Sequence, residues 1–106
     1  MSLEIINISD LITDLDPVVL VDDVKQLIIL VEMSQNCMED PEYILYYLEH
    51  LRSAVENDGS LFVNHANKIV QVFSLLMLRR VPGTLDDLQC RVSNYAVKFV
   101  QALVGF

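Results

Sequence analysis

The stretch from residue 40 to residue 59 reads DPEYILYYLEHLRSAVENDG, and it decides the fold class. Its apolar residues recur at i, i+4, i+7 and i+11, which places them along one side of an α-helix. These residues are Ile44, Leu48, Leu51 and Val55. Asp40-Pro41 is typical of a helix start, and the turn at 57–59 is typical of a helix end. The stretch therefore predicts an amphipathic helix over 41–57 with one face in a core.

The same reasoning predicts three further helices, over 17–36, 61–80 and 85–104. Asp16-Pro17 repeats the Asp-Pro start, and Ser60 and Thr84 are candidate caps for the last two helices. Their apolar stripes comprise Leu20, Val24, Leu27, Val31, Phe62, Ala66, Ile69, Phe73, Leu76, Leu88, Val92, Tyr95, Phe99 and Leu103. We expect one all-α domain over 1–106, an antiparallel bundle of four main helices. A short helix near 9–15, or an extended segment over 3–8, would precede it.

Length and composition limit the class of protein. A chain of 106 residues forms one domain, and 53% of its residues are hydrophobic. No run reaches the ~20 apolar residues needed to span a bilayer, and the N-terminus lacks the basic region of a secretory signal. With only Cys37 and Cys90 as cysteines, the sequence favours a reduced, cytoplasmic protein.

Charge is distributed unevenly along the chain. Residues 1–58 hold 13 acids and 2 bases, net −11, whereas residues 59–106 hold 2 acids and 5 bases, net +3. The total of −8 disfavours nucleic-acid binding, which needs clustered lysine and arginine. The polarity can steer a charged partner or join two copies head to tail, or it can balance within one fold.

The four stripes suffice to fill one core, yet many apolar residues lie off them. A helix that is apolar nearly all round is either central or covered from outside, and three helices of one small bundle cannot all be central. We therefore expect a homodimer or a protein partner on the second and the fourth or fifth helices. The candidate partner-binding residues are Ile29, Tyr46, Val72, Leu75, Leu78, Arg79, Arg80, Val97 and Val104. The alternative is that the apolar N-terminal segment covers this surface. Arg79-Arg80 is read first as a helix terminus and otherwise as a docking site for an acidic partner.

Residues able to carry chemistry are few. Neither His50 nor His65 has a second histidine or cysteine three or four positions away, so no helical metal pair is present. Cys90 is interpreted as a buried structural thiol, and the acidic clusters, Asp22-Asp23 among them, as helix-start features. We expect no catalytic, cofactor or metal site.

The sequence thus favours a non-enzymatic protein-interaction module, such as an adaptor, regulator or chaperone. A bundle that holds a small apolar ligand between its helices is the second hypothesis. An enzyme that uses Glu49, His50, His65 or Cys90 is the third, and it requires these groups to meet in one cleft.

Overall fold

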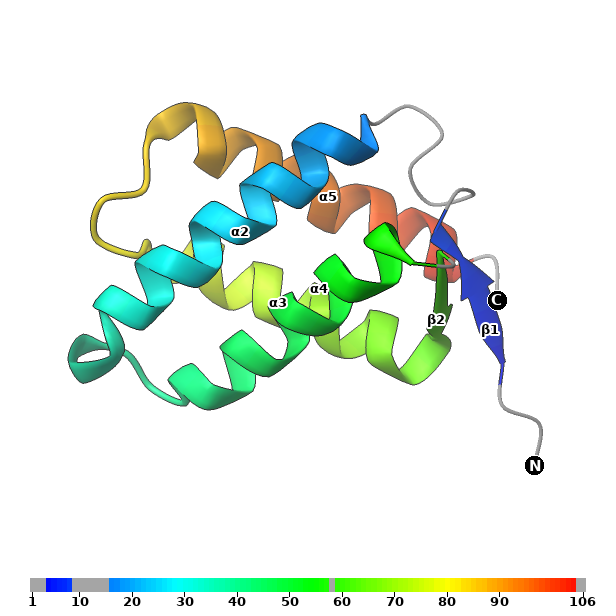
Figure 1. Cartoon of the computed structure of the whole chain (residues 1–106), viewed down its shortest axis with the longest axis horizontal. Helices are drawn as coiled ribbons and strands as arrows, with labels where there is room; N and C mark the ends of the chain where they lie inside the picture. The colour runs from blue at the N-terminus through cyan, green and yellow to red at the C-terminus, as the bar shows by residue number, and fades with distance from the viewer. Residues whose placement is uncertain (1–3, 9–15, 58, 105–106) are drawn as a thin grey trace.

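The computed structural model describes residues 4–8, 16–57 and 59–104, and in them four long helices pack against one another (Figure 1). The helices are α2 (Pro17–Met33), α3 (Pro41–Glu56), α4 (Val63–Leu78) and α5 (Asp86–Val104). A 3-10 turn, η1 (Gln35–Cys37), follows α2. The prediction of a helical fold with four main helices is confirmed. The helix expected near 9–15 lies outside the described residues.

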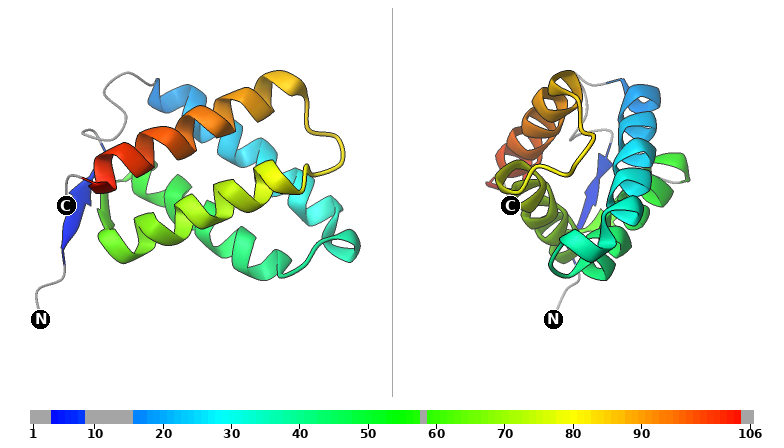
Figure 2. Two further views of the ribbon diagram at one scale, coloured as in Figure 1. Left: turned by 180° about the vertical axis from the view of Figure 1, so that it is seen from behind. Right: turned by 90° about the vertical axis from the view of Figure 1, so that its left-hand side faces the viewer.

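The helices form two pairs. α2 packs mainly on α3, and α4 packs mainly on α5. Figure 2 shows α2 and α3 on one side of the molecule and α4 and α5 on the other. The side chains between the pairs form the core.

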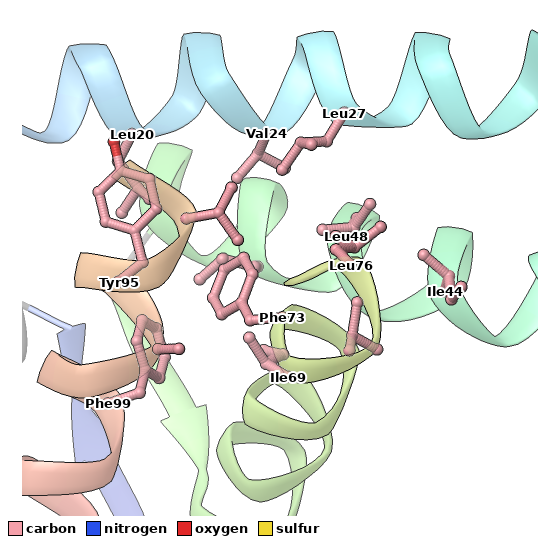
Figure 3. Close-up of a cluster of buried hydrophobic side chains, with 14 of the residues drawn as sticks. Leu20, Val24, Leu27, Ile44, Leu48, Ile69, Phe73, Leu76, Tyr95 and Phe99 are labelled. Carbon is pink, nitrogen blue, oxygen red and sulfur yellow. The ribbon is translucent and has the colours of Figure 1, made fainter. Parts of the chain in front are cut away.

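Most of the side chains that the helical periodicity predicts lie in the core, whereas Val55 and Leu103 are only partly buried. Leu20, Val24 and Leu27 of α2 are buried against residues of the other three helices (Figure 3). Val31 of the same helix is also buried. At its centre the ring of Phe73 lies 5.9 Å from that of Phe99 and 6.2 Å from that of Tyr95. Each large apolar side chain buried in this way stabilises the fold by roughly 1.5–3 kcal/mol.

The helix starts follow the sequence only in part. The side chain of Asp16 accepts a 2.9 Å hydrogen bond from the Val18 N–H, so this predicted cap is confirmed. Asp40 has φ 50° and makes no capping bond with its side chain. The predicted cap at Ser60 is wrong, because Ser60 lies in a strand. The predicted cap at Thr84 is also wrong, because α5 begins at Asp86 and the Thr84 hydroxyl has no hydrogen-bond partner among the described residues.

A two-stranded antiparallel sheet, which the sequence did not predict, joins the N-terminal segment to the connection between α3 and α4. β1 (Ile5–Asn7) pairs with β2 (Ser60–Phe62) in the register Ile5↔Phe62, Ile6↔Leu61 and Asn7↔Ser60. Ile6 and Leu61 point into the core, while Phe62, predicted as a core residue, is exposed. Gly59 has φ 74°, which favours glycine, and its carbonyl accepts from the Ile8 N–H.

Candidate functional site

The predicted partner-binding residues are spread over all four helices. Ile29, Tyr46, Leu75, Leu78, Val97 and Val104 are exposed. Val72 is 0% exposed, because it lies on the inner side of α4 next to Phe73. Val72 is therefore unavailable to a partner, and its assignment to the binding surface is wrong.

Arg79 and Arg80 follow the end of α4 and interact within the chain. Arg79 Nη1 lies 2.8 Å from Glu39 Oε2, which ties this helix end to the α2–α3 connection. Arg80 donates to the Thr84 carbonyl at 2.6 Å and to Asp86 Oδ1 at 2.5 Å. Arg79 and Leu75 also line a hollow of about 240 Å³ beside Cys37. Arg79 and Arg80 thus both bind acceptors within the same chain.

Apolar residues recur along one side of α4 and one side of α5, and we call these residues together the α4–α5 face. It comprises Val63, Val70 and Met77 on α4 and Cys90, Val97, Val100 and Val104 on α5. Residues seven apart lie on nearly the same line of a helix, so 63, 70 and 77 form one row and 90, 97 and 104 form another. Val97 is 49% and Val104 80% exposed. Cys90 is exposed as well, so its interpretation as a buried thiol is wrong.

The contacts of the two helices with the other pair show where this face points. On α4, Gln71 accepts from the Tyr43 hydroxyl of α3, and His65 contacts His50 of α3. On α5, Arg91 contacts Asp23 of α2. Each row lies on the side of its helix that faces away from these contacts. The two rows therefore flank the line along which α4 and α5 meet on the outside of the molecule.

The α4–α5 face carries almost no charge. The polar positions among its apolar residues, Asn67, Ser74, Ser93 and Gln101, are all uncharged. Asp86, in the first turn of α5, is paired with Arg80. An uncharged strip on a chain with net charge −8 has the composition of a contact surface rather than of a solvated face.

A second feature is a cluster of aromatic rings where α3 meets the start of α4. The rings of His50 and His65 contact edge to face with centroids 4.3 Å apart. Tyr46 stacks on His50 at 5.4 Å, and Phe62 meets His65 at 5.6 Å. Both histidines line a cleft of about 500 Å³ bounded by β1, β2 and the last turn of α3.

The two histidines are in different environments. Burial lowers the pKa of the His50 imidazole, and the neighbouring His65 lowers it further. The Nδ1 atom of His65 is buried and has no hydrogen-bond partner among the described residues. Of the four residues of the enzyme hypothesis, only these two meet, since Glu49 binds Arg52 at 2.6 Å and Cys90 lies on the α4–α5 face.

Among the described residues, Asp23 is the most deeply buried charged side chain, although its place in the sequence suggested a helix-start acid. It is 1% exposed, and it accepts from Arg91 Nε at 2.7 Å and from the Tyr95 hydroxyl. Burial raises the pKa of Tyr95, and the hydrogen bond to Asp23 raises it further. Asp23 falls between Leu20, Val24 and Leu27 on the buried stripe of α2, which is the signal that could have revealed it. These hydrogen bonds link α2 to α5, so we interpret the network as part of the structure that holds the two helices together.

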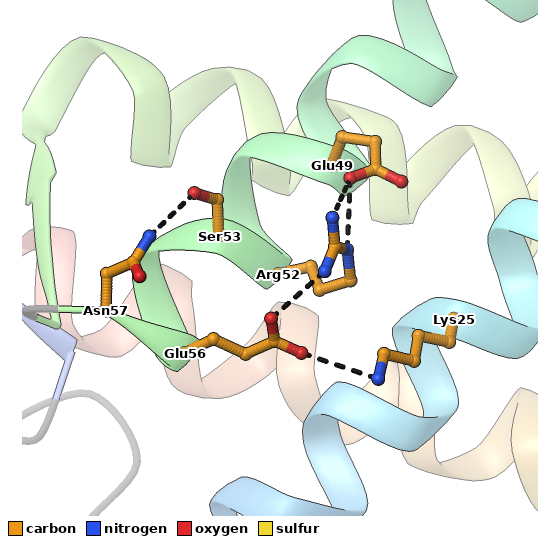
Figure 4. A network of polar contacts seen from close by, with 6 residues as sticks. All are labelled: Lys25, Glu49, Arg52, Ser53, Glu56 and Asn57. Atoms are coloured by element: carbon orange, nitrogen blue, oxygen red, sulfur yellow. Dashed lines mark hydrogen bonds and ion pairs between the residues drawn. The ribbon is translucent and has the colours of Figure 1, made fainter.

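A more exposed network joins α3 to α2 (Figure 4). Arg52 binds Glu49 and Glu56 within α3, and Lys25 of α2 reaches Glu56 at 3.5 Å. Exposed ion pairs contribute roughly 0–1 kcal/mol each, so this network is secondary to the core.

Within the described part of the chain, no group of three or more His, Cys, Asp or Glu residues could hold a metal ion. None of the helices there has the length and apolar character required to cross a membrane. Comparisons with protein-family models, with curated proteins and with solved structures found no significant match.

Proposed function

We propose that this protein is a non-enzymatic protein-interaction module, a small acidic adaptor, regulator or chaperone, that acts as a homodimer through its α4–α5 face. The observation that carries the proposal is a pair of apolar rows, 63/70/77 and 90/97/104, on one uncharged surface. Met77, Cys90, Val97 and Val104 are exposed, while Val63 and Val70 are partly buried. Water contact with such a strip costs free energy that a second molecule relieves.

The size of the α4–α5 face and its lack of charge favour a second copy of the chain as its binding partner. The 19 residues of α5 extend about 28 Å, and two neighbouring helices are ~18 Å wide, so the face covers roughly 500 Å². Specific interfaces use about 800 Å² per partner, to which flanking residues also contribute. Because the face is uncharged, two copies meet there without the repulsion between like charges that the acidic α2–α3 side would bring.

The experiment measures the mass of the chain in solution by size-exclusion chromatography with light scattering. At ~50 µM protein, a dimer with a Kd of ~1 µM is almost entirely assembled, so twice the chain mass is expected. Val97→Glu places a charge in the centre of the face and is expected to give a monomer with unchanged helical circular dichroism.

Val18→Glu is the matched control, because Val18 is an exposed valine on α2, outside the face. It is expected to leave the dimer intact. A wild-type chain that remains a monomer at this concentration overturns the proposal, and dissociation by Val18→Glu but not by Val97→Glu moves the interface to α2.

The proposal treats the four helices as an antiparallel bundle, supported by the chain direction in Figure 1, where each helix runs opposite to the one before it. We also propose a cytoplasmic location, which is supported by the two free, exposed cysteines. A bundle binding a small apolar ligand remains the second candidate, and the cleft of about 500 Å³ beside Leu61 and Phe62 favours it. A rise in melting temperature with fatty acids would support that function.

A further inference from the structure

We propose that His50 and His65 together bind one divalent transition-metal ion of the kind that prefers imidazole ligands, such as Zn²⁺, Ni²⁺ or Cu²⁺, at the wall of the cleft of about 500 Å³ that both residues line. These are the two histidines of the chain, and they come from different helices to line the same cleft. The site is independent of the α4–α5 face and therefore goes beyond the proposed dimer.

The distance between the rings is the first argument. Metal–nitrogen bonds of ~2.0–2.1 Å place two imidazoles of one ion with ring centres roughly 4.5–5.5 Å apart. The centroids of His50 and His65 are already 4.3 Å apart, with ring planes at 82°. Because the rings now meet edge to face at a distance just below this range, they would have to move apart slightly and turn for one nitrogen of each to reach a shared ion.

The availability of the donor atoms is the second argument. Buried polar atoms in folded proteins are nearly always hydrogen-bonded, and an exception calls for a missing ion or water. The buried Nδ1 of His65 is such an exception among the described residues. An imidazole binds a metal ion through an unprotonated ring nitrogen, and each of the two rings offers one such donor.

The surroundings indicate which ions fit. The cleft is open to solvent, so water can fill the remaining coordination positions, and its lining includes Ser53 and Asn57 but no carboxylate among the described residues. Magnesium and calcium prefer several oxygen ligands, whereas imidazole suits zinc, nickel and copper. The net charge of −8 also raises the local concentration of cations.

The test is a titration of the full chain with ZnCl₂ or NiCl₂, followed by isothermal calorimetry and by the ring-proton NMR signals of both histidines. Cys37→Ser/Cys90→Ser serves as the background, because both thiols are exposed and would bind these ions themselves. In this background we expect one saturable site that perturbs both rings. His50→Gln and His65→Gln should each weaken binding at least about tenfold.

Glu49→Gln is the matched control, since it removes a charge next to His50 without removing a ring, and it should leave the affinity within about twofold. MgCl₂ should produce no ring-specific shift. Binding that is unchanged in both histidine variants overturns the proposal, as does the absence of saturable binding below ~1 mM metal. Circular dichroism of each variant checks that the helices are retained.

Discussion

At the scale of single residues, Asp23 shows that the burial of a side chain depends more on its position on the helix than on its residue type. Asp22 and Asp23 are neighbours with the same side chain, yet Asp22 is exposed and Asp23 is 1% exposed. Asp23 is tolerated in the core because two of its bonds come from Arg91, whose charge compensates its own, and a third comes from the Tyr95 hydroxyl. The amphipathic pattern of α2 contains this information, but only a tertiary structure identifies the partners 68 and 72 residues away.

Asp23→Asn is expected to lower the free energy of unfolding by about 2–3 kcal/mol, because it removes the charge that Arg91 neutralises and weakens the acceptor for Tyr95. Asp22→Asn, which affects an exposed hydrogen bond to Gln26, is expected to change it by less than about 0.5 kcal/mol. Urea denaturation of both variants measures the difference. Equal effects would show that the network adds nothing to stability.

Tyr95 gives a prediction about pH. Its pKa is raised in the folded chain, so the unfolded chain loses the tyrosine proton first as the pH rises past ~10. The stability that Tyr95 contributes is therefore present below that pH and is lost above it. Tyr95→Phe should reduce the decline in unfolding free energy between pH 9 and 11, whereas Tyr46→Phe, at an exposed ring, should preserve it. Thermal denaturation at each pH measures both slopes, and identical slopes in wild type and Tyr95→Phe would contradict the assignment.

The contact between His50 and His65 could not be predicted from the sequence. His50 and His65 are 15 positions apart, on different helices, so no spacing rule for one helix can connect them. Their contact depends on how α3 and α4 pack and on the short strand β2 between them. In contrast, the exposed partner candidates on α5 could be predicted from the sequence, because a seven-residue repeat is a local property of one helix.

At the scale of elements, the helices were predictable and their ends less so. Four strong apolar periodicities placed α2 to α5 within three residues of their observed bounds. The three-residue strands are too short for an alternating pattern to develop, and their pairing joins residues 5–7 to 60–62. The two Asp-Pro starts look equivalent in sequence, yet only Asp16 accepts a bond from its helix.

This difference predicts opposite responses at the two helix starts. Asp16→Ala removes a capping bond and should cost about 1 kcal/mol of stability. Asp40 has φ 50° without a capping bond, so Asp40→Gly relieves a left-handed backbone at a site where no cap is lost. We expect Asp40→Gly to be neutral or to stabilise by up to about 1 kcal/mol. Urea denaturation compares the two, and an equal loss at both sites would mean that Asp40 caps α3 in solution.

At the scale of the whole molecule, the charge distribution and the apolar surface suggest different ways of association. Residues 1–58 carry net −11 and residues 59–106 net +3, which would favour a head-to-tail contact between unlike halves. The apolar rows instead favour a symmetric contact through the α4–α5 face, where both copies present the same uncharged strip. Ionic strength separates the two cases because salt screens only the charged contribution.

For the symmetric dimer, added salt should strengthen association. Two copies of net charge −8 repel each other, and the screening length falls from about 30 Å at 0.01 M salt to about 8 Å at 0.15 M. Dimerisation through an uncharged face should therefore become several-fold tighter over this range, as sedimentation velocity at a series of protein concentrations would measure. Val97→Glu should remain monomeric at both salt concentrations, because its charge lies inside the contact. Association that weakens as salt is added would instead show that the acidic half of one copy binds the basic half of the next.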